Sequence, residues 1–338
     1  MEKRGAVELQ FNWIFVVIAG GLILALVVSF IMVNIKNAGK TDADQTLRSI
    51  KTFIIGTASV RGKQTSVELN NLEMTYSDQQ IAIGGSTREA LMIFGPRKVK
   101  GRQLFVWTRD ISVPFLVSNI AYMTTEQVKY ILVYDPGNSA SVRLLREING
   151  SFSNMTNYVQ IPNYAISSMT DENNYMTVFS FIGTPMPPQI IGIKGNVIGV
   201  EVLPDETNIT GRINFYDYKT NAYAGDSYYI GKEMATGAIV CGDYYNYDNI
   251  SKQVFIRIKA MSEILAKRAQ MLNPGSSSDL GVRYETSYQR LMDIKDMMDS
   301  FSKDPSQLAL KSADFARQIQ ELSAQNKKIF VRSGATIY

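Results

Sequence analysis

The sequence predicts an α/β or α+β soluble domain with a C-terminal three-helix bundle, on one N-terminal transmembrane helix. Three observations lead to this prediction: an uncharged apolar run near the start, short β-type runs in the middle, and apolar stripes at helical spacing near the end. They divide the chain into an N-terminal tail (1–10), a transmembrane helix (11–34), a juxtamembrane helix (41–56), a mixed α/β domain (57–248), a C-terminal helical region (249–330) and a tail (331–338).

The predicted membrane anchor is the run from Trp13 to Val33, which contains 21 residues without a charge and includes Gly20 and Gly21. As a helix it would be about 30 Å long, which matches the hydrocarbon core of a bilayer. A buried core helix of this length would carry a polar stripe, and a cleavable signal peptide has a shorter apolar region that ends at a small-residue cleavage site. The run has neither feature, so we interpret it as a signal-anchor.

A juxtamembrane helix is predicted directly after the anchor. Thr41 is a suitable cap, and Asp42 and Asp44 place acidic residues in the first turn. The apolar residues that follow at helical spacing are Ala43, Leu47, Ile50 and Ile54.

Short β-type runs separated by Gly, Pro, Asn and Asp extend from Ser66 to Tyr247. The candidate strands are Ser66–Leu69, Ala90–Phe94, Gln103–Trp107, Tyr130–Tyr134, Met176–Ile182, Val197–Leu203 and Arg212–Tyr218. Two of them are nearly unbroken apolar runs, which is typical of strands buried on both faces. A helical pattern at Ser139–Ile148 follows one candidate strand and precedes others, so we expect at least one βαβ unit.

Three apolar stripes with steps of three and four residues predict the C-terminal helices. The stripes are Val254, Ile258, Met261, Leu265 and Leu272; then Tyr284, Tyr288, Leu291, Ile294, Met298 and Phe301; then Leu308, Phe315, Ile319, Leu322 and Ile329. Asp304 as a cap, with Pro305 and Gln307 after it, predicts the start of the last helix. The helices can pack as an antiparallel bundle or against the sheet.

The chain has no histidine and a single cysteine, Cys241. This composition excludes intramolecular disulfides, Cys/His zinc sites and any mechanism that needs an imidazole base. Cys241 follows Ala238, Ile239 and Val240, so we expect it to be a small buried apolar residue. The sequence predicts no metal site and no cofactor.

Three weak motifs are better explained by chance or by turns. The glycine-rich segment 191–199 lacks the spacing of a dinucleotide fingerprint and is more typical of a turn between strands. Tyr228 and Lys232 have the Tyr-x-x-x-Lys spacing of some reductases, but no dinucleotide motif accompanies them. Ser300 and Lys303 match Ser-x-x-Lys without either companion motif.

The segment 151–250 is acidic and rich in tyrosine. It contains 4 Lys+Arg, 10 Asp+Glu and 11 of the 18 tyrosines, whereas residues 251–338 contain 14 Lys+Arg and 9 Asp+Glu. No basic stripe runs through it, which argues against a nucleic-acid partner. Because tyrosine provides large contact area at small entropic cost, the segment suits a binding surface. The candidate residues of that surface are Asp217, Tyr218, Asp226, Tyr228, Asp243 and Tyr245.

The same acidic residues permit an alternative. Asp217, Asp226, Asp243 and Asp248 could bind calcium or serve a hydrolase that works without histidine. Their spacing matches no ligand loop, so we expect them to lie apart and mostly exposed. A hydrolase would instead need two of these carboxylates buried together in a cleft.

The N-terminal segment Arg4-Gly5-Ala6-Val7-Glu8-Leu9-Gln10-Phe11-Asn12-Trp13-Ile14-Phe15 carries a family resemblance. It is similar to that of a group of uncharacterised archaeal single-pass membrane-anchored proteins, and the final Ile337-Tyr338 and the C-terminal helices resemble the group as well. The resemblance implies an anchored exterior domain and no particular activity. Lys3-Arg4-Gly5 before Ala6 also resembles an archaeal class III prepilin signal, in which residues 1–5 would be removed. Glu8 then falls at the third position after the cut, whereas pilins usually have a glutamate at the fifth.

These observations predict a single-pass protein of the cell membrane with an extracytoplasmic domain. Lys3 and Arg4 before the anchor and Lys36, Lys40 and Arg48 after it do not decide the orientation, since long domains cross largely regardless of such differences. We expect a surface binding or structural protein without catalytic activity, whose partners are the lipid bilayer and a protein partner or a second copy of the chain. The alternatives are the anchored hydrolase and a pilin-like filament subunit.

Overall fold

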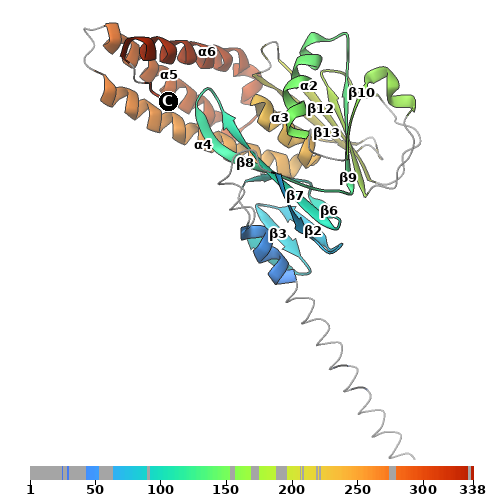
Figure 1. Cartoon of the computed structure of the whole chain (residues 1–338). Coiled ribbons are helices and arrows are strands. Elements are labelled where there is room, and N and C mark those ends of the chain that lie inside the picture. The colour runs from blue at the N-terminus through green and yellow to red at the C-terminus, as the bar shows by residue number, and fades with distance from the viewer. Residues whose placement is uncertain are drawn as a thin grey trace, which may run out of the picture.

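The structure is a computed structural model that describes most of the chain after residue 42. The described residues are Ala25, Ser29, 43–52, 64–89, 92–152, 157–168, 175–187, 196–205, Thr207, 209–217, Thr220, 222–273, 279–333 and 336–338. They form a mixed α/β fold with three sheets, followed by long C-terminal helices that extend to one side (Figure 1). The described part of the chain contains no helix long and apolar enough to cross a membrane. The anchor residues Trp13, Gly20, Gly21 and Val33 lie outside the described residues.

The largest sheet has six strands in the order β10-β9-β11-β12-β13-β14. Their bounds are β9 Val128–Tyr134, β10 Tyr158–Pro162, β11 Met176–Ile182, β12 Asn196–Pro204, β13 Thr210–Asp217 and β14 Ala222–Ile230. The first four strands are parallel, and β13 and β14 are antiparallel additions at one edge. The central strands β9 and β11 are buried almost throughout, which confirms the interpretation of their apolar sequences.

The predicted βαβ unit is present. Helix α2 (Ser139–Phe152) connects β9 to the neighbouring parallel strand β10. The Asn138 side chain accepts hydrogen bonds from the amides of Ala140 and Ser141 and so caps the helix. The buried residues of α2 include Leu144, Leu145 and Ile148, and they face the sheet core.

The sequence analysis missed helix α3 (Gly231–Cys241), which lies at the centre of the molecule. Every residue from Met234 to Cys241 is buried, because α3 is enclosed by the six-stranded sheet, α2, α4 and the strands β5, β7 and β8. A helix buried on all sides has no polar stripe, so its sequence shows no helical period. The buried position of Cys241 confirms the prediction for this residue.

A second sheet has the order β1-β7-β8-β5, and a small antiparallel sheet has the order β4-β3-β2-β6. Their bounds are β1 Gln64–Glu68, β2 Glu73–Ser77, β3 Gln80–Ile83, β4 Ser86–Glu89, β5 Ile93–Phe94, β6 Lys98–Lys100, β7 Gln103–Ser112 and β8 Leu116–Thr125. The helix of residues 43–52 packs on the small sheet through Ala43, Leu47 and Ile50, as its stripe predicts. Asp44 of this helix also pairs with Arg88 of β4 at 2.6 Å.

Three long helices follow, as the stripes predict: α4 (Tyr244–Leu272), α5 (Asp279–Lys303) and α6 (Gln307–Ser333). α4 begins five residues before the predicted boundary at 249, because Asp243 caps it by accepting a hydrogen bond from the Asn246 amide at 2.9 Å. Asp304 accepts hydrogen bonds from the amide of Ser306 and the side chain of Gln307, which confirms the predicted start of the last helix.

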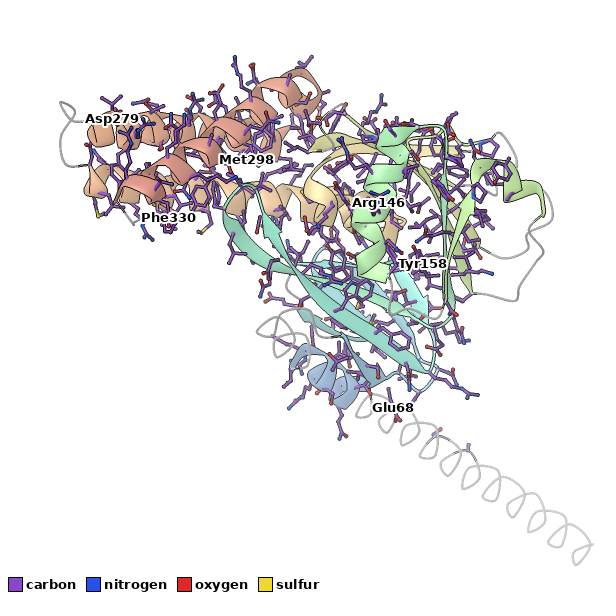
Figure 2. All side chains as sticks on the ribbon, turned by 45° about the horizontal axis from the view of Figure 1, so that its top comes forward. Glu68, Arg146, Tyr158, Asp279, Met298 and Phe330 are labelled. Atoms are coloured by element: carbon purple, nitrogen blue, oxygen red, sulfur yellow. The ribbon has the colours of Figure 1, made fainter. Side chains whose placement is uncertain are left out.

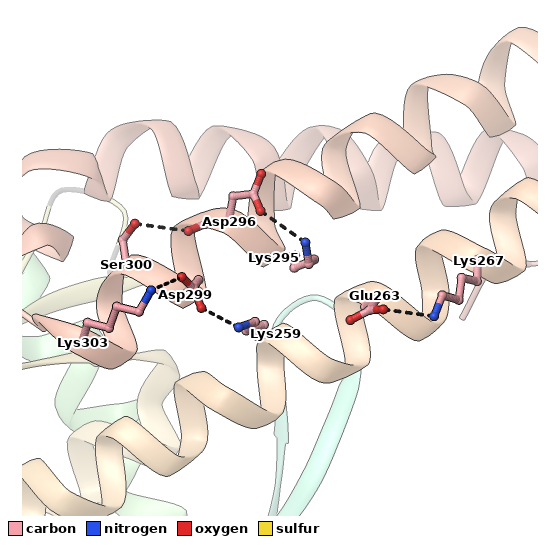
Figure 3. Close-up of polar contacts among 8 residues, drawn as sticks. All are labelled: Lys259, Glu263, Lys267, Lys295, Asp296, Asp299, Ser300 and Lys303. Atoms are coloured by element: carbon pink, nitrogen blue, oxygen red, sulfur yellow. Dashed lines mark hydrogen bonds and ion pairs between the residues drawn. The ribbon is translucent and has the colours of Figure 1, made fainter.

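Helices α4 and α6 each pack on α5, and we call this group the bundle. Figure 3 shows an ion pair between its first two helices, Asp299 of α5 with Lys259 of α4, and a second pair within α5, Asp299 with Lys303 at 2.6 Å. Hydrogen bonds from these two lysines lower the pKa of Asp299 to about 2. The Lys259–Asp299 pair joins α4 and α5 at the surface, whereas Phe255, Phe301 and Phe315 form the buried contact among the three helices.

The last residues of the chain pack against the bundle. Arg268 of α4 donates to the Thr336 carbonyl, and the Asn326 side chain of α6 bonds both the Ile337 amide and the Tyr338 carbonyl. Ile337 is fully buried, and the Tyr338 ring meets Phe115 edge-on beside the β7–β8 connection. Residues 336–338 therefore bridge α4 and α6.

Candidate functional site

The carboxyl ends of the parallel strands are the usual ligand position in an open α/β sheet, especially where the connections diverge. That point lies between β9 and β11, because β9 connects towards β10 and β11 pairs with β12 on its other side. Here the Asn138 side chain donates to the Gly183 carbonyl at 2.9 Å, and the Ser141 hydroxyl donates to the Ile182 carbonyl. These side chains occupy the crevice and bond the strand ends, so they hold the fold together at this point.

The free edge of the six-stranded sheet at β14 is the stronger candidate. Among the described strands, β14 pairs only with β13, and its first three residues, Ala222–Ala224, are exposed. The Tyr223 side chain is 52% exposed. An exposed edge strand presents unpaired backbone donors and acceptors to any partner that approaches.

Arg212, Tyr223 and Asp226 form a polar group on one side of this edge. The Arg212 Nε lies 3.2 Å from Asp226 Oδ2, and the Tyr223 hydroxyl donates to the same carboxylate. Tyr216 meets the Tyr223 ring edge-on, with centroids 5.6 Å apart. The hairpin of β13 and β14 carries all four side chains, so the backbone ladder holds the group in place.

The other side of the edge is formed by the start of α4. The Tyr244 ring lies over Gly225, where an added Cβ would come within 2.9 Å of the ring. Tyr245, which is 66% exposed, packs edge-on against Tyr244. The buried Tyr247 donates to the Tyr228 carbonyl and fixes α4 against the strand. We call the exposed parts of Tyr223, Asp226, Tyr228, Tyr244 and Tyr245 the β14 edge surface.

The hydroxyls of Tyr223, Tyr228 and Tyr244 stay protonated near neutral pH. Burial raises the pKa of Tyr223 and Tyr228, and the negative charge of Asp226 raises both further, against the opposing effect of Arg212. Burial likewise raises the pKa of Tyr244, with Asp248 acting in the same direction. The surface therefore offers neutral phenols and a carboxylate, which suit hydrogen bonding and stacking.

Only some of the predicted surface residues lie together in the structure. Asp226, Tyr228 and Tyr245 belong to the β14 edge surface, and Asp217 is exposed at the end of β13. Asp243 lies beside the surface but caps α4, so its role is structural. Tyr218 lies outside the described residues.

The expectation that all four aspartates are mostly exposed is right only for Asp217. Asp226 and Asp243 are half-buried, and the Asp248 side chain is 14% exposed. Asp248 pairs with Lys252 at 2.6 Å and accepts from Ser227 at 3.4 Å. The tertiary structure supplies each half-buried carboxylate with a polar partner, which offsets the cost of its burial.

Glu233, in the first turn of α3, is a perturbed acid that the sequence analysis missed. Burial raises its pKa, and the charge of Glu147 adds to this effect while Lys232 and Arg109 oppose it. An acidic residue at a helix start interacts favourably with the helix dipole, which gives Glu233 a structural role. The described residues contain no group of three or more Asp, Glu or Cys side chains that could hold a metal ion.

An open cavity of about 540 Å³ lies between the helix of residues 43–52 and the end of β1 with the turn that follows it. Its lining residues are Gln45, Thr46, Ser49, Val67, Glu68, Asn70 and Leu72. The lining contains one carboxylate and no aromatic ring, so it indicates no ligand class.

The chain matches no protein-family model, no curated protein and no solved structure.

Proposed function

We propose that the protein is a membrane-anchored binding or structural protein that engages a protein partner through the β14 edge surface. The observation that carries the proposal is an edge strand that is exposed at Ala222–Ala224 and flanked by tyrosines from two elements, held in place by the β13–β14 ladder and by Tyr247. Rigid aromatic side chains beside free backbone groups are typical of surfaces that bind proteins.

The aspartates support binding over hydrolysis. Asp226 forms an ion pair with Arg212 and accepts a hydrogen bond from Tyr223. Asp243 caps α4, and Asp248 forms an ion pair with Lys252. A hydrolase without histidine would need two carboxylates that share a cleft and raise each other's pKa. The separate partners of these aspartates favour a role in shaping the surface.

We also propose that the segment 11–34 crosses the cell membrane once and that the domain lies on the extracytoplasmic side. The length of the uncharged run, its flanking Trp13 and the N-terminal resemblance support this proposal. The rigid attachment of the helix of residues 43–52 to the small sheet suits a domain that is held close to a membrane.

The orientation can be tested with one introduced cysteine. Burial raises the pKa of the Cys241 thiol, so the native protein should not react with a membrane-impermeant maleimide. In the Leu310→Cys variant the new thiol replaces a side chain that is 80% exposed, and it should react in intact cells. Labelling of this variant only after lysis would place the domain in the cytoplasm. Labelling of the native protein under denaturing conditions serves as the positive control.

The binding surface can be tested by site-specific photocrosslinking in cells. A benzophenone amino acid at Tyr223 should give a discrete adduct, because this side chain lies at the exposed edge. The same probe at Tyr164, which is 77% exposed but lies beyond the opposite edge of the sheet, is the matched control. Equal adducts from both positions, or none from Tyr223, would argue against the β14 edge as a binding surface.

A further inference from the structure

The far end of the bundle carries a cluster of exposed apolar side chains, which we call the bundle tip. They come from the end of α4, the start of α5 and the end of α6, and the Arg332–Asp279 ion pair holds α6 beside α5 there. Figure 2 labels Asp279 and Phe330 at this end. The members are Ile264, Met271, Leu272, Val282, Phe330 and Val331, and they are between 37% and 82% exposed. Such a cluster on one end of a domain indicates an interaction site.

The bundle tip is also basic. Its charged residues are Lys267, Arg268, Arg283, Lys327, Lys328 and Arg332, against Glu263, Asp279 and Glu285. A partner with acidic and aromatic chemistry would complement this tip.

The β14 edge surface has the complementary chemistry. It presents Tyr223, Tyr228 and Tyr245, it lies near the exposed Asp217, and it belongs to the acidic segment 151–250, while its Asp226 is already paired with Arg212. The two surfaces lie at opposite ends of α4, since Tyr244 begins the helix and Leu272 ends it. At 1.5 Å per residue, this helix separates them by about 40 Å.

We propose that the partner of the β14 edge surface is the bundle tip of a second copy of this chain, so that copies associate head to tail. This inference rests on the proposed function and names its partner. Every copy carries both surfaces, at the two ends of α4, and two different surfaces on each copy are what a heterologous interface requires. Such contacts form a ring if the rotation closes and a filament if it does not.

Two other occupants of the bundle tip are disfavoured. A symmetric contact between two tips would bring together the six basic side chains of each tip, against three acidic ones in each, and this excess of like charge costs free energy. A lipid surface would have to reach the end of the bundle that lies farthest from the helix of residues 43–52, which follows the predicted anchor (Figure 1). The β14 edge surface of a second copy avoids both difficulties, because it belongs to an acidic segment and need not lie at the membrane.

The test uses the full chain in detergent micelles and measures mass by analytical ultracentrifugation. The tip variant combines Met271→Glu with Val331→Asp, and the edge variant combines Tyr223→Arg with Tyr245→Arg. All four native side chains are more than half exposed, so both variants should retain the fold. The native chain should form concentration-dependent species above the dimer or one closed ring. Each variant alone should be monomeric. An equimolar mixture of the two should form dimers and nothing larger, because only one complementary pair of surfaces remains.

The matched control is Leu310→Asp, on α6 but away from the tip and equally exposed, and it should associate like the native chain. A native chain that is monomeric at all concentrations would overturn the inference. Association that persists in the tip variant would also overturn it and would indicate contacts through the anchor. Association that is lost in the tip variant but kept in the edge variant would overturn it too and would indicate a symmetric tip contact. Loss of vesicle binding in the tip variant without loss of self-association would indicate a lipid surface instead.

The failure of this inference can be distinguished from that of the proposed function. If the Tyr223 crosslink joins a different protein while the native chain stays monomeric, the β14 edge still binds a partner and only the second copy is wrong. If Tyr223 gives no adduct, both proposals fail.

Discussion

Replacing Gly237 with alanine should destabilise the fold by about 1–3 kcal/mol, the usual cost of overpacking a core. Gly237 lies inside α3, where an added Cβ would come within 2.5–2.7 Å of the Phe94 ring. Phe94 cannot move away easily, because it is fully buried and stacks between Tyr122 and Tyr247. Urea unfolding followed by far-UV circular dichroism measures the change in the free energy of unfolding.

The matched control is Gly150→Ala in α2. This glycine is also helical, but nothing lies within 4 Å of the position that a Cβ would occupy. Alanine is favoured over glycine in a helix, so this variant should gain about 0.5–1 kcal/mol. Opposite signs for the same chemical change would show that α3 is packed directly against the second sheet. A stabilising Gly237→Ala would mean that the two sheets approach α3 less closely than described.

Replacing Ile337 with alanine should cost about 2–5 kcal/mol, although the residue lies next to the last position of the chain. Its side chain is fully buried, and its amide donates to the Asn326 side chain at 2.8 Å. Truncation of the side chain leaves a cavity between the bundle and the β7–β8 connection. Thermal and urea unfolding of the full chain in detergent would measure the loss.

Val331→Ala is the control for this change. Val331 is a β-branched residue six positions earlier and is 82% exposed, so its truncation should alter the free energy of unfolding by less than about 0.5 kcal/mol. If Ile337→Ala were equally mild, residues 336–338 would not contribute to the bundle. Terminal residues usually tolerate change, so a large effect at Ile337 would be direct evidence of its docking.

The bundle links the two proposed surfaces mechanically. α4 begins beside the β14 edge and ends at the bundle tip. The Lys259–Asp299 ion pair (Figure 3) and the buried Phe255 hold it against α5. Changes that loosen α4 should therefore weaken head-to-tail association even when they touch neither surface. In a membrane, anchoring would confine the copies to two dimensions and raise their effective concentration.

The sequence by itself determined the elements whose patterns are local and long. The stripes of α4, α5 and α6 and the capping residues Asp304 and Gln307 are confirmed in the structure. The apolar strands β9 and β11 and the helix between β9 and β10 are confirmed as well, because strands buried on both faces have continuous apolar sequences and the helix has a clear helical spacing. The burial of Cys241 follows from its apolar neighbours.

The tertiary structure alone decided the features that depend on residues far apart in the chain. Helix α3 has no visible period because its partners surround it, and its Glu233 carbonyl accepts from Tyr122, 111 residues away. The candidate surface is an edge only because no described strand pairs beyond β14, and its Asp226 is paired because β13 brings Arg212 beside it. Ile337 is a core residue because the end of the chain packs back on α6, where the Ile337 amide donates to the Asn326 side chain. Local propensity determines helices and strands, but burial and pairing are set by non-local contacts, which a single sequence does not display.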